Sequence, residues 1–280
     1  MSNRKTTILD RMDPSTGVRA IEGVGRAAMD RATVGGRAVL LFVDACYQLP
    51  KIGRGLPQLF RQIEVCGIGS LFVLGLIAFL TGMIMAVQTG SELQNVGVVD
   101  RLGAIIGATF VRELGPLWAA IIMLARVGAA MAAELGTMAV NEEVDALRVM
   151  NINPVRFLVL PRVLALIVSM PLLTVIADWV GMAGGLAVAT NVFNRSADEF
   201  IRSAQGILGN LDFYSGLAKA TVFGAIIATI ACDRGLNTTD GAEGVGRSTN
   251  QTVVLSVIAV LIADLVMTGF IQQILKPALL

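Results

Sequence analysis

The chain has 280 residues, of which 55% are apolar and only 15% are charged. Soluble domains carry about 25% charged residues, so this composition excludes an ordinary soluble protein and indicates an integral membrane protein. A net charge of +1 argues against nucleic acid as a partner, and the absence of histidine, with three widely spaced cysteines (Cys46, Cys66 and Cys232), argues against a metal site.

The N-terminal segment is basic. Residues 1–62 hold ten of the 22 Lys and Arg residues against five Asp and Glu. Because basic residues are retained on the cytoplasmic side of a membrane, we expect a cytoplasmic N-terminus. Residues 1–14 are polar, which argues against a signal peptide. We assign residues 1–50 to a cytoplasmic extension and residues 51–280 to the membrane domain.

Residues 51–64 are predicted to form a helix that lies in the inner membrane interface. Their apolar side chains fall at helical spacing, and basic and amide side chains occupy the rest of the helix surface, as in other interfacial helices. The apolar residues are Ile52, Leu56, Leu59, Phe60 and Ile63. The alternative is an ordinary linker bounded by Pro50 and Pro57.

Five apolar segments follow, each long enough to cross a bilayer, which requires about 20 residues. They cover residues 65–91, 102–133, 163–193, 211–232 and 248–275. Five spans that start in the cytoplasm place the C-terminus in the periplasm. Charges interrupt the second and fourth segments, so either could instead be re-entrant.

Several charged residues fall within or beside these spans. They are Arg112, Glu113, Arg126, Glu134, Asp178 and Asp264. Charges inside a membrane are costly, so they are usually functional or paired. Arg112 and Glu113 are adjacent and point about 100° apart on a helix, so they cannot simply pair with each other. They predict either a polar anchor beside a substrate path or pairing that fixes helix packing.

The other four charges are interpreted as structural. Arg126 and Glu134 are eight residues apart and roughly share one helix face, whereas Asp178 and Asp264 each stand in an otherwise apolar span.

Residues 141–150, NEEVDALRVM, predict a short polar helix between spans two and three. Asn141 is a favourable N-cap, and acidic residues in the first turns suit the helix dipole. Val140, Val144 and Leu147 make one apolar stripe. A helix of this length is marginal alone in water, so something must hold it. It either packs on its own protein or docks in a groove of a cytoplasmic motor subunit.

Residues 241–248, GAEGVGRS, match a phosphate-binding loop except that Arg247 replaces the lysine. A true phosphate-binding loop follows a buried strand, whereas this segment follows a membrane span. We therefore expect a glycine-rich turn and no ATPase site in this chain.

Taken together, these residues resemble the MlaE/YrbE permease family, the membrane subunits of MCE-type ABC transporters. The resemblance covers about residues 50–275. The matching motifs are RELGP at 112–116, ARVG at 125–128, AELGTM at 133–138, EEVDAL at 142–147, PR at 161–162 and GAEGVG at 241–246, which leads into Asp264.

The resemblance implies an all-α fold in the bacterial inner membrane, with an N-terminal interfacial helix, five transmembrane helices and a cytoplasmic coupling helix between spans two and three. It also implies a second permease copy, identical or paralogous, a cytoplasmic ABC ATPase that binds the ATP, and an MCE-domain protein outside. The expected substrate is phospholipid or a related lipid, and the permease itself is not an enzyme and holds no cofactor.

The resemblance also assigns expected roles to two groups of residues. The expected lipid cavity is lined by Met85, Gln88, Leu93, Arg112 and Glu113. The expected contact with the ATPase comprises Glu142, Glu143, Val144, Asp145 and Leu147. Glu143 stands where many members have glutamine, which adds a negative charge to that contact.

Two other functions are compatible with the residues alone. An ion- or proton-coupled secondary transporter would use Asp178, Lys219 and Asp264, although such proteins usually show paired repeat halves and we find no internal repeat. A membrane scaffold without transport is the third option.

Overall fold

The computed structural model describes residues 36–48 and 56–275, and all the regular secondary structure within those ranges is helical. Five helical stretches there are long and apolar enough to cross a membrane. The all-α membrane architecture is therefore confirmed. The expectations for residues 1–35 and 49–55 lie outside the described residues.

The spans are longer than their predicted apolar centres. Span one is α2 (Leu56–Val96), span four is α9 (Asn210–Leu236), and span five is α10 (Gly241–Phe270) with the π-helical η7 (Ile271–Leu275). Span three is η6 (Val155–Val159) followed by α7 (Leu160–Asn191). Spans two and four are continuous helical stretches of 42 and 27 residues, each long enough to cross a bilayer.

Span two is built from several helical segments in series. They are η3 (Val99–Arg101), α3 (Leu102–Thr109), η4 (Phe110–Leu114), α4 (Gly115–Met123), η5 (Leu124–Gly128) and α5 (Ala129–Val140). Both η4 and η5 are π-helical, so their backbone hydrogen bonds span five residues instead of four.

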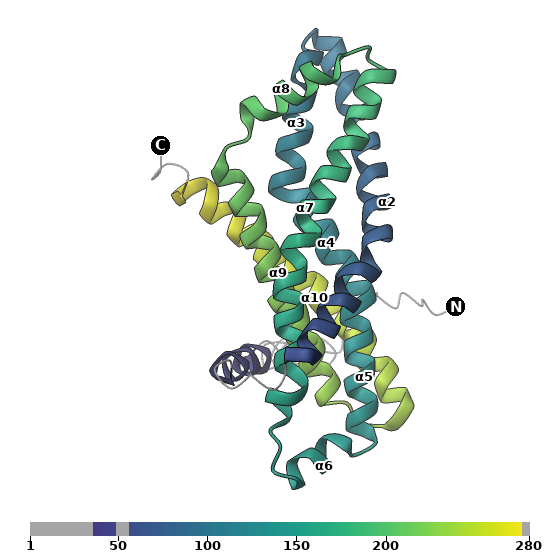
Figure 1. Cartoon of the computed structure of the whole chain (residues 1–280), viewed down its shortest axis with the longest axis vertical. Helices are drawn as coiled ribbons and strands as arrows, with labels where there is room; N and C mark the ends of the chain where they lie inside the picture. Colours follow the sequence, from purple (N-terminus) through teal and green to yellow (C-terminus); the bar gives the residue numbers. More distant parts are fainter. Residues whose placement is uncertain (1–35, 49–55, 276–280) are drawn as a thin grey trace, which may run out of the picture.

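The first three spans run mainly along the long axis of the molecule, and α9 and α10 cross it obliquely (Figure 1). The short helix α6 (Glu143–Val149) lies at one end, and α8 (Ala197–Ile207) packs on α3 at the other. The most extensive packing is between α2 and α7. There Gly82 meets the backbone of Gly181 so closely that a Cβ atom at Gly82 would collide with it. Small residues permit this close approach of membrane helices.

The N-terminal boundary differs from the expected one. Residues 56–64 continue into α2 without a break, because Pro57 lies in the first turn, where its missing N–H is tolerated. A separate helix covers residues 36–48 and lies across the direction of the spans (Figure 1). Leu40 and Tyr47 are among its exposed apolar side chains. Residues 36–48 thus form a helix with an apolar surface ahead of α2, and the interfacial position expected of residues 51–64 stays a prediction.

Candidate functional site

The charged pair of span two lies in a π-helical turn. Arg112 and Glu113 belong to η4, and Pro116 follows at the start of α4. Because proline has no N–H, Pro116 cannot donate a hydrogen bond to the carbonyl of Arg112, four residues earlier. Nζ of Lys219 donates to that carbonyl oxygen across 3.1 Å. The proline of the RELGP sequence thus leaves the carbonyl oxygen of Arg112 available to accept a hydrogen bond from another span.

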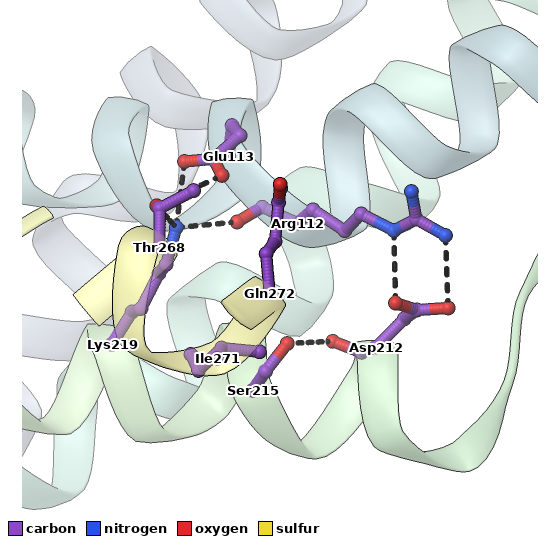
Figure 2. Close-up of a pocket in the computed structure, with 8 residues that line it drawn as sticks. All are labelled: Arg112, Glu113, Asp212, Ser215, Lys219, Thr268, Ile271 and Gln272. Carbon is purple, nitrogen blue, oxygen red and sulfur yellow. Dashed lines mark hydrogen bonds and ion pairs between the residues drawn. The ribbon is translucent and has the colours of Figure 1, made fainter. Parts of the chain in front are cut away.

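Lys219, on α9, is the centre of the site. Its side chain is 2% exposed, yet its ammonium lies 2.6 Å from Oε2 of Glu113 and 2.9 Å from Oδ1 of Asp264 on α10. It also donates to Oγ1 of Thr268 across 2.6 Å, and Thr268 in turn donates to Oε1 of Glu113. A buried charge requires such pairing, so this cluster joins spans two, four and five (Figure 2).

Arg112 forms a second ion pair, on the other side of the same pocket. Its Nε and Nη2 atoms donate to the two carboxylate oxygens of Asp212 across 2.9 and 3.1 Å. This two-pronged geometry is the strongest that arginine makes with a carboxylate. Asp212 also accepts from the backbone N–H of Gly209 at the start of α9. Arg112 therefore fixes η4 to the beginning of span four.

The two ion pairs border one small pocket. It is lined by Arg112, Glu113, Asp212, Ser215, Lys219, Thr268, Ile271 and Gln272 (Figure 2). Its volume of about 20 Å³ has room for roughly one water molecule. Among its charged side chains, Arg112 and Glu113 are the most exposed, at 29% and 31%. The pocket accommodates a polar group at its mouth and no acyl chain.

Sequence reasoning missed Asp212 as the partner of Arg112 and placed Lys219 only in the secondary-transporter alternative. The sequence did hold one indication of this site: Asp212 and Lys219 are seven positions apart and so share a face of span four.

The structure does not bring all the predicted cavity residues together. Met85, Gln88 and Leu93 lie towards the end of α2, with Gln88 exposed and the other two half-buried. The pocket around Arg112 is lined from η4, α9, α10 and η7 and not from α2. A cavity shared by spans one and two stays a prediction that would require a second permease copy.

The remaining membrane charges have separate partners. Arg126 donates to Ser70 on α2 across 3.1 Å, with its guanidinium over Gly69. Glu134 pairs with the buried Arg162 at 2.9 Å and not with Arg126, because it faces α7.

Asp178 is buried on α7. It packs against Gly115, and its Oδ1 atom has no hydrogen-bond partner within the described residues.

The predicted coupling helix exists but starts later than expected. Asn141 ends α5, so its assignment as an N-cap is wrong: Glu142 occupies that position, with a left-handed φ of 59°. Val144 is buried and Leu147 half-buried against the chain's own core. The apolar stripe of α6 is therefore turned inward.

The outer surface of the α6 segment is acidic at its start and apolar at its C-terminal end. The acidic side chains expected at the ATPase contact are all exposed, namely Glu142, Glu143 and Asp145. Val149 and Met150 are 87% and 61% exposed.

The glycine-rich segment 241–248 forms the first turns of α10, after a turn in which Asp240 and Gly241 have positive φ. Arg247 lies beside Asp240 and Glu243. Among the described residues a membrane helix and not a strand precedes it, as expected, but the expectation of a turn over residues 241–248 is wrong, because the turn ends at Asp240 and these residues are helical.

Comparison with known proteins identifies the family. The family model described as Permease MlaE matches residues 59–270. A probable ABC transporter permease protein of Rickettsia typhi is 37% identical over 219 residues, which cover 78% of this chain and 85% of that protein. One from Synechocystis is 37% identical over 213 residues, covering 76% of this chain and 81% of that protein.

A third relative is the Arabidopsis thaliana chloroplastic protein TRIGALACTOSYLDIACYLGLYCEROL 1, which is 39% identical over 213 residues. The match covers 76% of this chain and 61% of that longer protein. On the family match and these identities, the chain belongs to the MlaE family of ABC transporter permeases.

Proposed function

We propose that this multi-pass membrane protein moves phospholipid, or a related lipid, between membranes and that ATP hydrolysis in a separate subunit drives the movement. The observation that carries the proposal is the charged cluster around Lys219, which joins three spans within the membrane region and exposes one cation and one anion at a pocket mouth. The Arabidopsis relative supports a lipid substrate, because its name refers to trigalactosyldiacylglycerol.

Membership of an ABC permease family implies a partner ATPase and a pairing of permeases. We propose that the ATPase docks on the outer surface of the α6 segment, through Glu142, Glu143 and Asp145 and the exposed Val149 and Met150. The chain itself then contributes transport and no catalysis.

The basic N-terminal segment supports one orientation of the chain in the membrane. We propose the bacterial inner membrane, with the N-terminus in the cytoplasm and the C-terminus in the periplasm. In this orientation α8 faces the periplasm, the side on which an MCE-domain partner would receive or deliver lipid.

One observation favours the secondary transporter as a second candidate. Asp178 is a buried acid with an unpaired oxygen, which is the kind of group that a proton-coupled carrier uses. The two functions differ in their energy source, because only the first requires a bound ATPase.

The experiment is purification of the full chain in mild detergent from cells that express its neighbouring genes, followed by reconstitution in liposomes. We expect an ATPase to co-purify and lipid transfer to require ATP. Transfer that follows a proton gradient and ignores ATP would support the second candidate instead.

A further inference from the structure

The charges around the pocket do not balance. Two cations, Arg112 and Lys219, are surrounded by three carboxylates, those of Glu113, Asp212 and Asp264. In a membrane region these charges are poorly screened, so an added group with only negative charge would meet net repulsion.

The two cations also differ in what they can still bind. The ammonium of Lys219 is buried and already faces two carboxylates, a hydroxyl and a carbonyl. Two of the three nitrogens of the Arg112 guanidinium donate to Asp212. Figure 2 shows the third nitrogen pointing away from Asp212, and no partner for it is present among the described residues.

Glu113 provides the complementary group. Its side chain is 31% exposed, whereas that of Lys219, which it contacts, is 2% exposed. Figure 2 shows the Glu113 carboxylate and the Arg112 guanidinium at opposite ends of the pocket, with Gln272 between them. The mouth therefore offers one hydrogen-bond donor with positive charge and one carboxylate, separated by an amide.

We propose that this pocket selects lipids with a zwitterionic headgroup, whose phosphate binds Arg112 and whose ammonium binds Glu113. The inference rests on the proposed function and names the substrate class of the same site. A zwitterion adds no net charge beside the three carboxylates, whereas an anionic lipid leaves Glu113 opposed to a second negative group. The acyl chains lie outside, because the pocket is too small for them.

The test compares headgroups at the pocket mouth. The full chain carries the photoreactive substitution Gln272→p-benzoylphenylalanine and is placed in micelles with equal amounts of three lipids of the same acyl chains. These are phosphatidylethanolamine, N-acetyl-phosphatidylethanolamine, which keeps the phosphate but loses the positive charge, and phosphatidylglycerol. Mass spectrometry measures the lipid attached after illumination. We expect about tenfold more phosphatidylethanolamine than either anionic lipid, the effect of one charge-assisted contact.

Variants assign the effect to its residues. Glu113→Gln should make the labelling of the three lipids equal, and Arg112→Met should lower the labelling of all three. Glu199→Gln is the matched control, because Glu199, on α8, pairs with Arg195 away from the pocket, and the preference should remain. If Glu113→Gln does not fold, the comparison of lipids on the otherwise unchanged chain still decides the question, since two of the lipids differ chiefly in the charged amine.

Equal labelling of phosphatidylethanolamine and its N-acetyl form, or a preference for phosphatidylglycerol, would overturn the selectivity and leave the proposed function intact. Labelling by none of the three lipids would count against the proposed function as well.

Discussion

The Nζ atom of Lys219 lies 2.6 Å from Oε2 of Glu113, although the two residues are 106 positions apart in the chain. This contact joins spans two and four inside the membrane region, and Asp264 extends it to span five. The cluster therefore ties a motif in span two to two later spans.

Lys219→Met should be the most damaging substitution in the cluster. It leaves Glu113 and Asp264 without their shared cation, and breaking a buried pair typically costs about 3–5 kcal/mol. The thermal stability of the detergent-purified chain measures this loss. The double variant Lys219→Met with Glu113→Gln removes one stranded charge and should recover part of the stability. A double variant less stable than the single one would contradict the pairing.

Asp212→Asn should have a smaller effect. The substitution removes the charge that accepts both donors of Arg112 but keeps an oxygen that can accept from Gly209. Loss of one charge-assisted contact corresponds to about 1.5–3 kcal/mol. Denaturation of the variant beside Asp198→Asn, an exposed residue of α8, checks this. Equal stability of the two variants would mean that Arg112 does not depend on Asp212.

Two glycines of α2 allow a matched test of the packing between α2 and α7. A Cβ atom at Gly82 would collide with the backbone of Gly181, whereas one at Gly75 would meet nothing within 4 Å. Gly82→Ala should therefore destabilise the chain by about 1–3 kcal/mol, the usual cost of overpacking. Gly75→Ala should be neutral or slightly stabilising, because alanine favours helix. The same melting temperature for both variants would contradict the close approach.

Two residues of the α6 segment allow docking of the ATPase to be tested separately from the stability of the chain. Leu147 packs against the chain's own core, so Leu147→Asp should lower the stability of the isolated chain. Met150 is exposed, so Met150→Asp should leave that stability unchanged and reduce the amount of ATPase that co-purifies. Thermal unfolding and the ratio of the two subunits after purification give both readouts. Undiminished co-purification with Met150→Asp would move the docking surface elsewhere.

The positions of the spans and the importance of the charged residues in span two could be predicted from the sequence. The length of an apolar segment and the charges that interrupt it are both local properties. The partners of the charges could not be predicted. Glu134 shares a helix face with Arg126 but pairs with Arg162, since the pairing is set by which span packs beside it. Arg112 finds Asp212 for the same reason.

Helix boundaries were the other limit. Asn141 is a good N-cap by type, yet the chain turns one residue later, at Glu142 in the left-handed region. The crosswise helix at residues 36–48 escaped prediction because its apolar residues surround most of the helix and give no amphipathic pattern.

The most direct measurement of the central claim is lipid transfer by the full chain, assembled with its ATPase, between liposomes and an acceptor membrane. Arg112 is the exposed cation of the site, so Arg112→Met should reduce ATP-dependent transfer about tenfold below that of Asp212→Asn, which loses the same ion pair but keeps the cation, while the ATPase stays bound in both complexes. Glu199→Gln should transfer lipid at the wild-type rate. Unchanged transfer by a stable Arg112→Met complex would contradict the account.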